Sequence, residues 1–205
     1  MFAMIQVLQA NQLTLRDVKD KFGLQRTSNS GFFKSWQQPV LDLSEHEKKT
    51  LDQAQASFLY LAEGLVQEPL VKMVVVSPLL SVAGFYEKPY LTFAEHTTAV
   101  EIAASEEIIR GRIDVLVVNQ QVWVAIVEAK NSQLSLSVGL PQTLAYMASD
   151  QQTNQPKFGL VTNGTDLEFV KLDPKAGLYA LSRAYSLNNP GNDLYEVASV
   201  LRAIR

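Results

Sequence analysis

The sequence predicts a mixed α/β domain in which helices flank one central β-sheet. Capping boxes followed by apolar residues at helical spacing indicate helices in the first third of the chain. Residues 90–127 and 158–172 are rich in apolar and β-branched residues, which indicates strands. A helical pattern separates these two parts. Helices and strands in this order typically pack as layers around a sheet.

Composition limits the class of protein. The 205 residues are 47% hydrophobic and 19% charged, enough for a sizeable core. The lack of cysteine excludes disulfides and thiolate metal sites. No apolar run approaches the roughly 20 residues of a membrane span, and the start lacks a basic leader, so we expect a cytoplasmic protein without a membrane partner. The net charge of −3 argues mildly against nonspecific DNA binding, although local fields can outweigh it.

Residues 1–43 are predicted to form a helical N-terminal extension and linker, and residues 44–205 the main domain. Thr14 and Asp17 have the spacing of a capping box at the start of a short helix. Residues 26–40 are predicted to be a loop, although they contain Phe32, Phe33 and Trp36. Packing on the protein's own core is the preferred explanation for these aromatics, with a partner contact as the alternative.

A longer helix is predicted to begin at Ser44, where Glu47 completes a second capping box. Its apolar face would comprise Leu51, Ala54, Phe58, Leu61 and Leu65. Gly64 and Pro69 indicate a break near residues 64–69. Residues 70–80 fit either a strand or a helix, and a helix is preferred.

The strands are expected at residues 90–95 and 99–109, followed by a hairpin of 113–118 and 122–127. The hairpin strands are apolar on both faces, which predicts a sheet covered on both sides. A helix is expected at residues 134–147, with Pro141 as an alternative first turn. Asn163-Gly164 predicts a tight turn between strands at 158–162 and 166–172, before a last helix at 193–204.

Charged residues interrupt the apolar hairpin at three positions. Asp114 opens its first strand, and Glu128 and Lys130 end its second. Strand side chains alternate between faces, so Glu128 and Lys130 point the same way. Burying such charges is costly unless they are paired or bind a cation, which predicts a metal site. The alternative is a surface ion pair worth about 0–1 kcal/mol.

This arrangement suits phosphodiester hydrolysis. Two carboxylates and the backbone carbonyl of Ala129 offer the hard oxygen ligands that Mg²⁺ prefers, with Mn²⁺ as a substitute. Such a cation lowers the pKa of bound water and neutralises charge on the phosphorus. Lys130 can orient the attacking water or stabilise the developing negative charge.

Further motifs lie on either side of the hairpin. Glu68 precedes Val71-Lys72 upstream, and Gln142 and Tyr146 lie one helical turn apart downstream. With the hairpin, residues 58–175 resemble the PD-(D/E)xK nuclease superfamily, and look most like the N-terminal nuclease domain of type I restriction-enzyme motor subunits and its stand-alone relatives. The resemblance implies a restriction-endonuclease-like core, in which a helix with an acidic residue packs on a four-stranded mixed sheet.

The resemblance also implies a role for each residue. Asp114, Glu128 and Lys130 match the catalytic trio, although Ile113 stands where the fuller pattern has proline. Glu68 would complete the metal shell, with Glu63 as a competing candidate and a helix-surface charge as the plain alternative. Gln142 would position water or a phosphate. Tyr146 would support Gln142 or contact backbone, and simple helix packing is equally open for it.

The implied function is a Mg²⁺-dependent DNA endonuclease, or a nuclease subunit, in restriction or defence. No Walker-type phosphate-binding sequence occurs and 205 residues cannot house a helicase motor, so we expect a nuclease domain without one. DNA contacts are expected from a partner subunit that supplies specificity, from a homodimer formed through residues 1–57, or from basic residues such as Lys72, Lys88, Arg110 and Arg112. The alternative is a catalytically silent module for DNA binding or complex assembly.

Overall fold

The computed structural model describes residues 6–29, 31–33, 43–102, 107–119, 122–149 and 154–205, with the backbone alone at residues 6, 98–102 and 122–129. Nine strands of this part form one sheet: β1 (Gln6–Gln9), β2 (Gln25–Arg26), β3 (Tyr90–Ile102), β4 (Glu107–Asn119), β5 (Val122–Ala129), β6 (Lys157–Thr162), β7 (Asp166–Asp173), β8 (Leu178–Leu181) and β9 (Tyr185–Ser186). Their order is β1-β4-β5-β6-β7-β8-β2, with β3 beside β4 and β9 beside β7. β5 and β6 are parallel and the β6–β7 pair is antiparallel, so the sheet is mixed.

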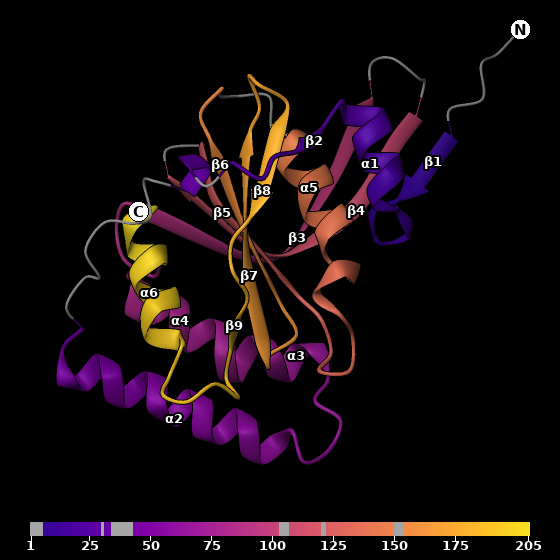
Figure 1. Cartoon of the computed structure of the whole chain (residues 1–205). Helices are drawn as coiled ribbons and strands as arrows, with labels where there is room; N and C mark the ends of the chain where they lie inside the picture. The colour runs from indigo at the N-terminus through magenta and orange to yellow at the C-terminus, as the bar shows by residue number, and fades with distance from the viewer. Residues whose placement is uncertain (1–5, 30, 34–42, 103–106, 120–121, 150–153) are drawn as a thin grey trace, which may run out of the picture.

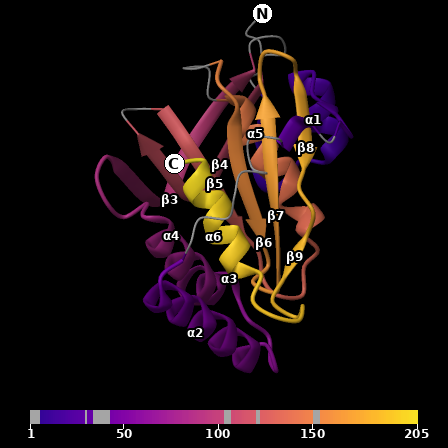
Figure 2. The same cartoon turned by 60° about the vertical axis from the view of Figure 1, so that its left-hand side comes forward.

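Helices lie on both sides of this sheet (Figures 1 and 2). They are α1 (Leu15–Phe22), α2 (Glu45–Leu61), α3 (Glu68–Val71), a π-helical segment (Lys72–Val76), α4 (Ser77–Ala83), α5 (Leu140–Ser149) and α6 (Leu194–Ala203), with 3₁₀ turns at Ala10–Gln12 and Leu136–Val138. The predicted class, a mixed sheet flanked by helices, is confirmed. No helix in the described ranges is long and apolar enough to cross a membrane.

Local sequence signals explain where the helices begin. Both predicted capping boxes form: Thr14 and Asp17 bond reciprocally at α1, and Ser44 and Glu47 do so at α2. Residues 70–80 are helical, as preferred, although the middle of the run is π-helical. Pro141 lies in the first turn of α5, so the alternative start is confirmed. α2 ends at Leu61, which leaves Leu65 55% exposed, and the prediction that Leu65 is in the apolar face is wrong.

Some strand predictions are wrong in their boundaries. Residues 90–102 form the single strand β3, and the expected strand at 99–109 is divided between β3 and β4, with residues 103–106 outside the described part. The polar residues near 95–98 do not end β3, because every residue of the strand except Glu95 pairs with β4. The hairpin turn at residues 120–121 and Trp36 also lie outside the described residues. Phe32 packs against the sheet, where its ring lies 5.3 Å from Lys171 Nζ.

The N-terminal extension contains the predicted helix α1 and also supplies two strands to the sheet. β1 pairs in parallel with β4, and β2 pairs in parallel with β8. The contact of α1 with α5 holds the extension on one face. The division of the chain at residue 43 stays a prediction.

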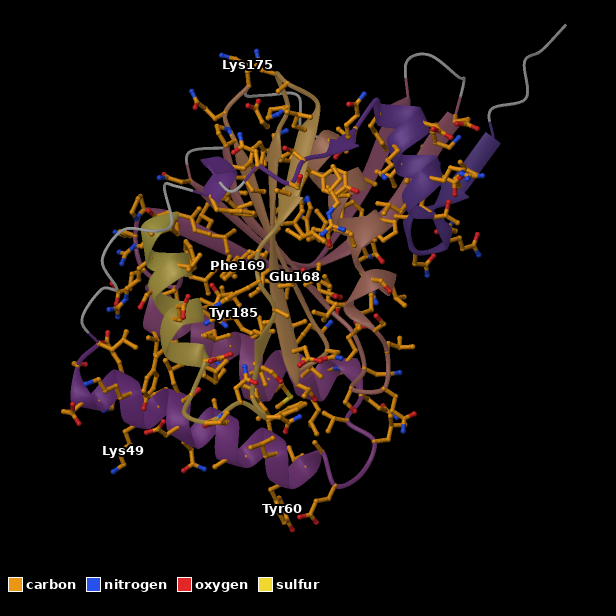
Figure 3. The ribbon with its side chains drawn as sticks, in the orientation of Figure 1. Lys49, Tyr60, Glu168, Phe169, Lys175 and Tyr185 are labelled. Atoms are coloured by element: carbon orange, nitrogen blue, oxygen red, sulfur yellow. The ribbon has the colours of Figure 1, made fainter. Side chains whose placement is uncertain are left out.

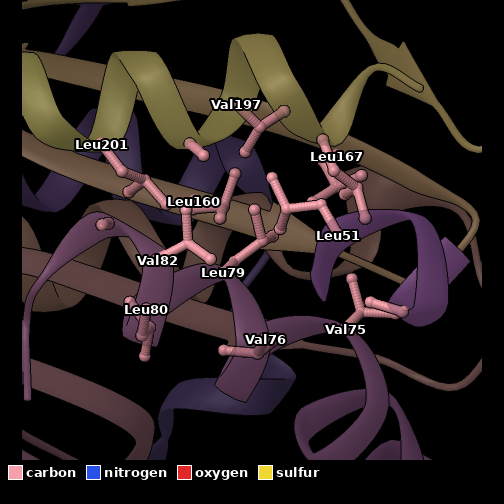
Figure 4. Packing of buried hydrophobic residues seen from close by; sticks show 14 of the residues in the cluster. Leu51, Val75, Val76, Leu79, Leu80, Val82, Leu160, Leu167, Val197 and Leu201 are labelled. Carbon is pink, nitrogen blue, oxygen red and sulfur yellow. The ribbon is translucent and has the colours of Figure 1, made fainter. Parts of the chain in front are cut away.

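Two apolar clusters cover the two faces of the sheet, as predicted. On one face, side chains of α2, α4 and α6 pack on the sheet; Figure 4 shows Leu79 and Val82 facing Val197 and Leu201, with Leu160 among them. On the other face, α1 and α5 cover strand residues that include Val161 and Tyr179. Burial of both faces explains the nearly continuous apolar strands of the sequence.

β4 changes its neighbour along one edge. Its residues 107–110 pair with β1, and its residues 115–119 pair with β5. β3 pairs along the other edge of both halves. Residues 111–114 therefore lie in a fork between β1 and β5, and within the described part of the chain they pair with neither strand on that edge.

The turn after β6 requires glycine for two reasons. Gly164 has φ +90°, and a Cβ there would lie 2.2 Å from the Phe58 ring of α2. Gly191 has nearly the same backbone conformation, φ +89°, with nothing within 4 Å of an added Cβ. Alanine substitutions at these two glycines therefore separate the cost of the left-handed backbone from the cost of a clash with Phe58.

We expect Gly164→Ala to lower the free energy of unfolding by about 2–5 kcal/mol, combining left-handed strain with overpacking. Gly191→Ala is the matched control and should cost only about 1–2 kcal/mol. Urea unfolding at 25 °C measures both. Equal losses for the two variants would contradict the contact with Phe58.

Polar contacts tie α6 to α2 and make part of the stability depend on pH. Tyr195 Oη donates to Asp52 Oδ1 at 2.6 Å, and Asn192 Nδ2 donates to the same atom at 3.0 Å. These hydrogen bonds, that of Tyr195 foremost, lower the pKa of Asp52. The stabilisation is therefore complete above the ordinary aspartate pKa of about 3.9 and is lost as the pH falls through the lower folded-state pKa.

Asp52→Ala should consequently be less stable than the unaltered chain at pH 7, with a difference that shrinks below about pH 3. Urea unfolding across this pH range provides the measurement. Asp20→Ala, at an exposed aspartate of α1, controls for removal of a negative charge. A pH-independent difference for Asp52→Ala would contradict the assignment.

Candidate functional site

A cavity of about 390 Å³ lies beside the fork in β4. Five of the six side chains proposed from the sequence line it: Glu68, Asp114, Lys130, Gln142 and Tyr146. They come from α3, β4, the end of β5 and α5. The sixth, Glu128, is placed by its backbone in β5 opposite Val161 of β6, and its side chain lies outside the described part. Glu63, the competing candidate, is exposed beyond the end of α2 and does not line the cavity.

Lys130 follows directly after β5, where the chain leaves the sheet. Its backbone N–H donates to the carbonyl oxygen of Thr162 at 2.7 Å, which extends the parallel pairing with β6. Its Nζ donates to Gln142 Oε1 at 3.3 Å. Lys130 is thus held by β6 at its backbone and by α5 at its side chain.

Gln142 and Tyr146 supply hydrogen-bond donors to the fork. Gln142 Nε2 donates to Tyr146 Oη at 3.0 Å, and Tyr146 Oη donates to the carbonyl oxygen of Arg112 at 3.1 Å. Gln142 is 6% and Tyr146 0% exposed. A buried carbonyl without a donor is costly, so this pair stabilises the fork.

Gly111 permits this close packing. A Cβ at Gly111 would lie 2.2 Å from Tyr146 Oη and 2.7 Å from Ala10 Cβ. The missing side chain lets α5 and the N-terminal segment both approach β4. Gln9 and Asn11 join the lining of the cavity there.

Two acidic residues of the cavity lining, Asp114 and Glu68, pair with Lys72. Its Nζ lies 3.2 Å from Asp114 Oδ1, 3.4 Å from Glu68 Oε1 and 2.5 Å from Glu95 Oε1. Arg112 Nη1 lies 2.7 Å from the other oxygen of Glu95. Asp114 itself is only 4% exposed, so it depends on this pairing.

These ion pairs favour the charged forms of Lys72 and Glu95. Burial by itself would lower the pKa of Lys72, but the hydrogen bond to Glu95 and the nearby carboxylates of Asp114 and Glu68 outweigh it and raise that pKa. The hydrogen bond from Lys72 is the main cause that lowers the pKa of Glu95. Both groups are therefore charged at neutral pH.

The structure adds residues that sequence reasoning did not assign to the site. Lys72 was named among the basic residues that could contact DNA, although its i,i+4 spacing from Glu68 could have indicated the ion pair. Glu95 was missed because its position opposite Asp114 depends on the register of β3 and β4. Arg110 lines the cavity and Arg112 does too, whereas Lys88 does not.

The carboxylates have the chemistry of a divalent-cation site. Asp114 and Glu68 already bring one oxygen each to the same ammonium nitrogen, and oxygen ligands of this type suit Mg²⁺. Among the described side chains, no group of three acidic or histidine residues is arranged to hold a metal ion. The fit therefore rests on Asp114 and Glu68; the other carboxylate predicted from the sequence, Glu128, has its side chain outside the described part.

One family and one solved structure show what this chain is similar to. Residues 88–182 match the family described as type I restriction enzyme R protein N terminus (HSDR_N). A solved structure described as a fragment of an HsdR subunit of a type I restriction enzyme from Vibrio vulnificus YJ016 is 25% identical, with a TM-score of 0.42. That match covers 60% of this chain and 24% of the other, so it spans about a quarter of the relative's length. The search of curated proteins found no match.

The matched residues include Asp114, Glu128, Lys130, Gln142 and Tyr146, and Glu68 precedes them. The resemblance recognised in the sequence is confirmed for this part of the chain: residues 88–182 are similar to the N terminus of the type I restriction enzyme R protein.

Proposed function

We propose that this chain is a Mg²⁺-dependent endonuclease, or a nuclease subunit, that hydrolyses phosphodiester bonds in DNA. The observation that carries this proposal is the convergence of Glu68, Asp114, Lys130 and Gln142 on one cavity. A place in restriction or defence follows from the relationship to the type I R protein.

Each residue has a role in this proposal. Asp114, Glu68 and Glu128, with the carbonyl of Ala129, would hold Mg²⁺ or its substitute Mn²⁺. When bound, the cation supplies acidified water and neutralises charge on the phosphate. Lys130, which Gln142 orients, would donate to a phosphate oxygen as negative charge develops. Arg110 and Arg112 line the same cavity, where they would attract the DNA backbone.

Tyr146 is assigned a positioning role. Its hydroxyl joins Gln142 to the backbone of β4 near Asp114, so it links the two halves of the cavity. It is fully buried, which excludes a large contact area with DNA. The roles that the sequence left open for Tyr146, which are support of Gln142, contact with backbone, and helix packing with a hydrogen-bonded hydroxyl, all fit this geometry.

A catalytically silent module for DNA binding or complex assembly is the second candidate. The ion pairs of Lys72 with Asp114 and Glu68 favour it, because an ammonium already neutralises two proposed metal ligands. DNA is the proposed partner of the nuclease and of a DNA-binding module. A partner subunit, a homodimer and a cytoplasmic location stay predictions.

Lys130→Met should lower the rate of DNA cleavage by about 10²–10³-fold, because it removes one charged donor to the reacting phosphate. Binding of Mn²⁺ should persist in this variant and be lost in Asp114→Asn. Nicking of supercoiled plasmid gives the rates, and isothermal titration calorimetry gives the affinities.

Lys175→Met, at an exposed lysine at the tip between β7 and β8, is the matched control and should cleave normally; Figure 3 shows Lys175 at the opposite end of the molecule from α2. Unchanged cleavage by Lys130→Met would refute the proposed chemistry. Mn²⁺ binding without any cleavage by the unaltered chain would support the silent module instead.

Tyr146→Phe should lower the free energy of unfolding by about 1–3 kcal/mol, because the Arg112 carbonyl loses a buried donor. Tyr179 is the matched control: it is equally buried, but its hydroxyl has no hydrogen-bond partner among the described residues. Tyr179→Phe should therefore change stability by less than about 0.5 kcal/mol. Urea unfolding compares the two, and equal effects would contradict the role given to Tyr146.

A further inference from the structure

Lys72 is unusual because three carboxylates meet at its ammonium. Asp114 and Glu68 lie on the cavity side, and Glu95 lies on β3 with 42% of its side chain exposed. The Lys72 side chain is only 16% exposed. A half-buried ammonium at this position acts electrostatically in the same sense as a divalent cation, because it neutralises carboxylates that would otherwise repel one another.

Glu95 is placed to hold Lys72 without help from Asp114. Its neighbours Ala94 and His96 pair with Val115 and Ile113, so Glu95 lies directly across from Asp114. Like charges directly opposite each other on paired strands are destabilising. Lys72 bridges the two, with its shorter contact to Glu95 at 2.5 Å against 3.2 Å to Asp114.

Two rare backbone conformations meet at this contact. Glu95 has φ +57°, in the left-handed region that residues other than glycine seldom adopt. Lys72 begins the π-helical segment between α3 and α4. Both features cost conformational energy and are commonly found at functional sites. Their coincidence at one ion pair indicates that the geometry of Lys72 and Glu95 serves the site.

We propose that the Lys72 ammonium competes with a divalent cation for the Asp114 and Glu68 carboxylates, and that Glu95 retains the ammonium when those carboxylates bind the cation. Lys72 and Glu95 thus set how readily the site takes up metal. This inference rests on the proposed metal-dependent function. It explains why an ammonium contacts two proposed metal ligands without requiring the site to be silent.

The proposal predicts effects of opposite sign for its two residues. Removing the ammonium with Lys72→Met should tighten Mn²⁺ binding by about tenfold or more, because the cation no longer displaces a charge. Glu95→Gln should weaken Mn²⁺ binding, since Lys72 would then stay on Asp114. In the Lys72→Met background, Glu95→Gln should have no further effect, because Glu95 acts through Lys72 rather than as a metal ligand.

Isothermal titration calorimetry with Mn²⁺ on the full chain measures all four members of this cycle. Thermal unfolding with and without Mn²⁺ gives an independent readout: Lys72→Met should melt lower than the unaltered chain without the ion and gain more from its addition. Lys175→Met controls for loss of one positive charge and should leave the affinity unchanged. Asp114→Asn should abolish binding in both the unaltered and the Lys72→Met background.

Three outcomes would each refute a different part of the proposal. Mn²⁺ binding that is equal or weaker in Lys72→Met than in the unaltered chain refutes the competition and leaves the metal-dependent function standing. A loss in Glu95→Gln that persists in the double variant refutes the transfer to Glu95 and makes it a ligand. Absence of Mn²⁺ binding in every member of the cycle refutes both the competition and the metal-dependent function.

Discussion

The hydrogen-bonding needs of β4 determine where the site can form. A strand inside a sheet must satisfy the backbone groups on both of its edges. β4 does so with β3 on one edge, but on the other edge it leaves β1 before it meets β5. In the fork between them, Tyr146 and Gln142 of α5 provide donors to the backbone in place of a strand. The fork also creates the space in which side chains from distant segments can meet.

The same fork accounts for the distribution of charge. Asp114 is the last residue of the fork before β4 pairs with β5, and it is almost fully buried. A buried carboxylate requires a counter-ion, and Lys72 provides it from a helix on one side. Lys130 is held on the other side by Gln142. At the cavity, the negative charge of Asp114 is therefore compensated by Lys72, and the positive charge of Lys130 is directed toward α5.

Much of this arrangement could be predicted from local signals. The capping boxes at Thr14 and Ser44, the apolar strands and the Gln142–Tyr146 spacing each depend on residues close in sequence, which pattern reasoning reads well. The remainder depends on contacts between distant residues. β1 and β2 are short strands defined only by the partners they pair with. Glu95 becomes part of the site only through the strand register that sets it opposite Asp114. The resemblance could assign Glu68, but not the lysine one turn later that binds it.

β1 has a consequence for the dynamics of the cavity. It is a four-residue edge strand, and the residues that follow it, Ala10 and Asn11, line the cavity. Short edge strands open locally at a free energy well below that of global unfolding. Such fraying would widen the entrance while Asp114, Gln142 and Tyr146 stayed anchored in the core. Amide hydrogen exchange at residues 7–9 therefore reports on access to the site separately from the integrity of the fold.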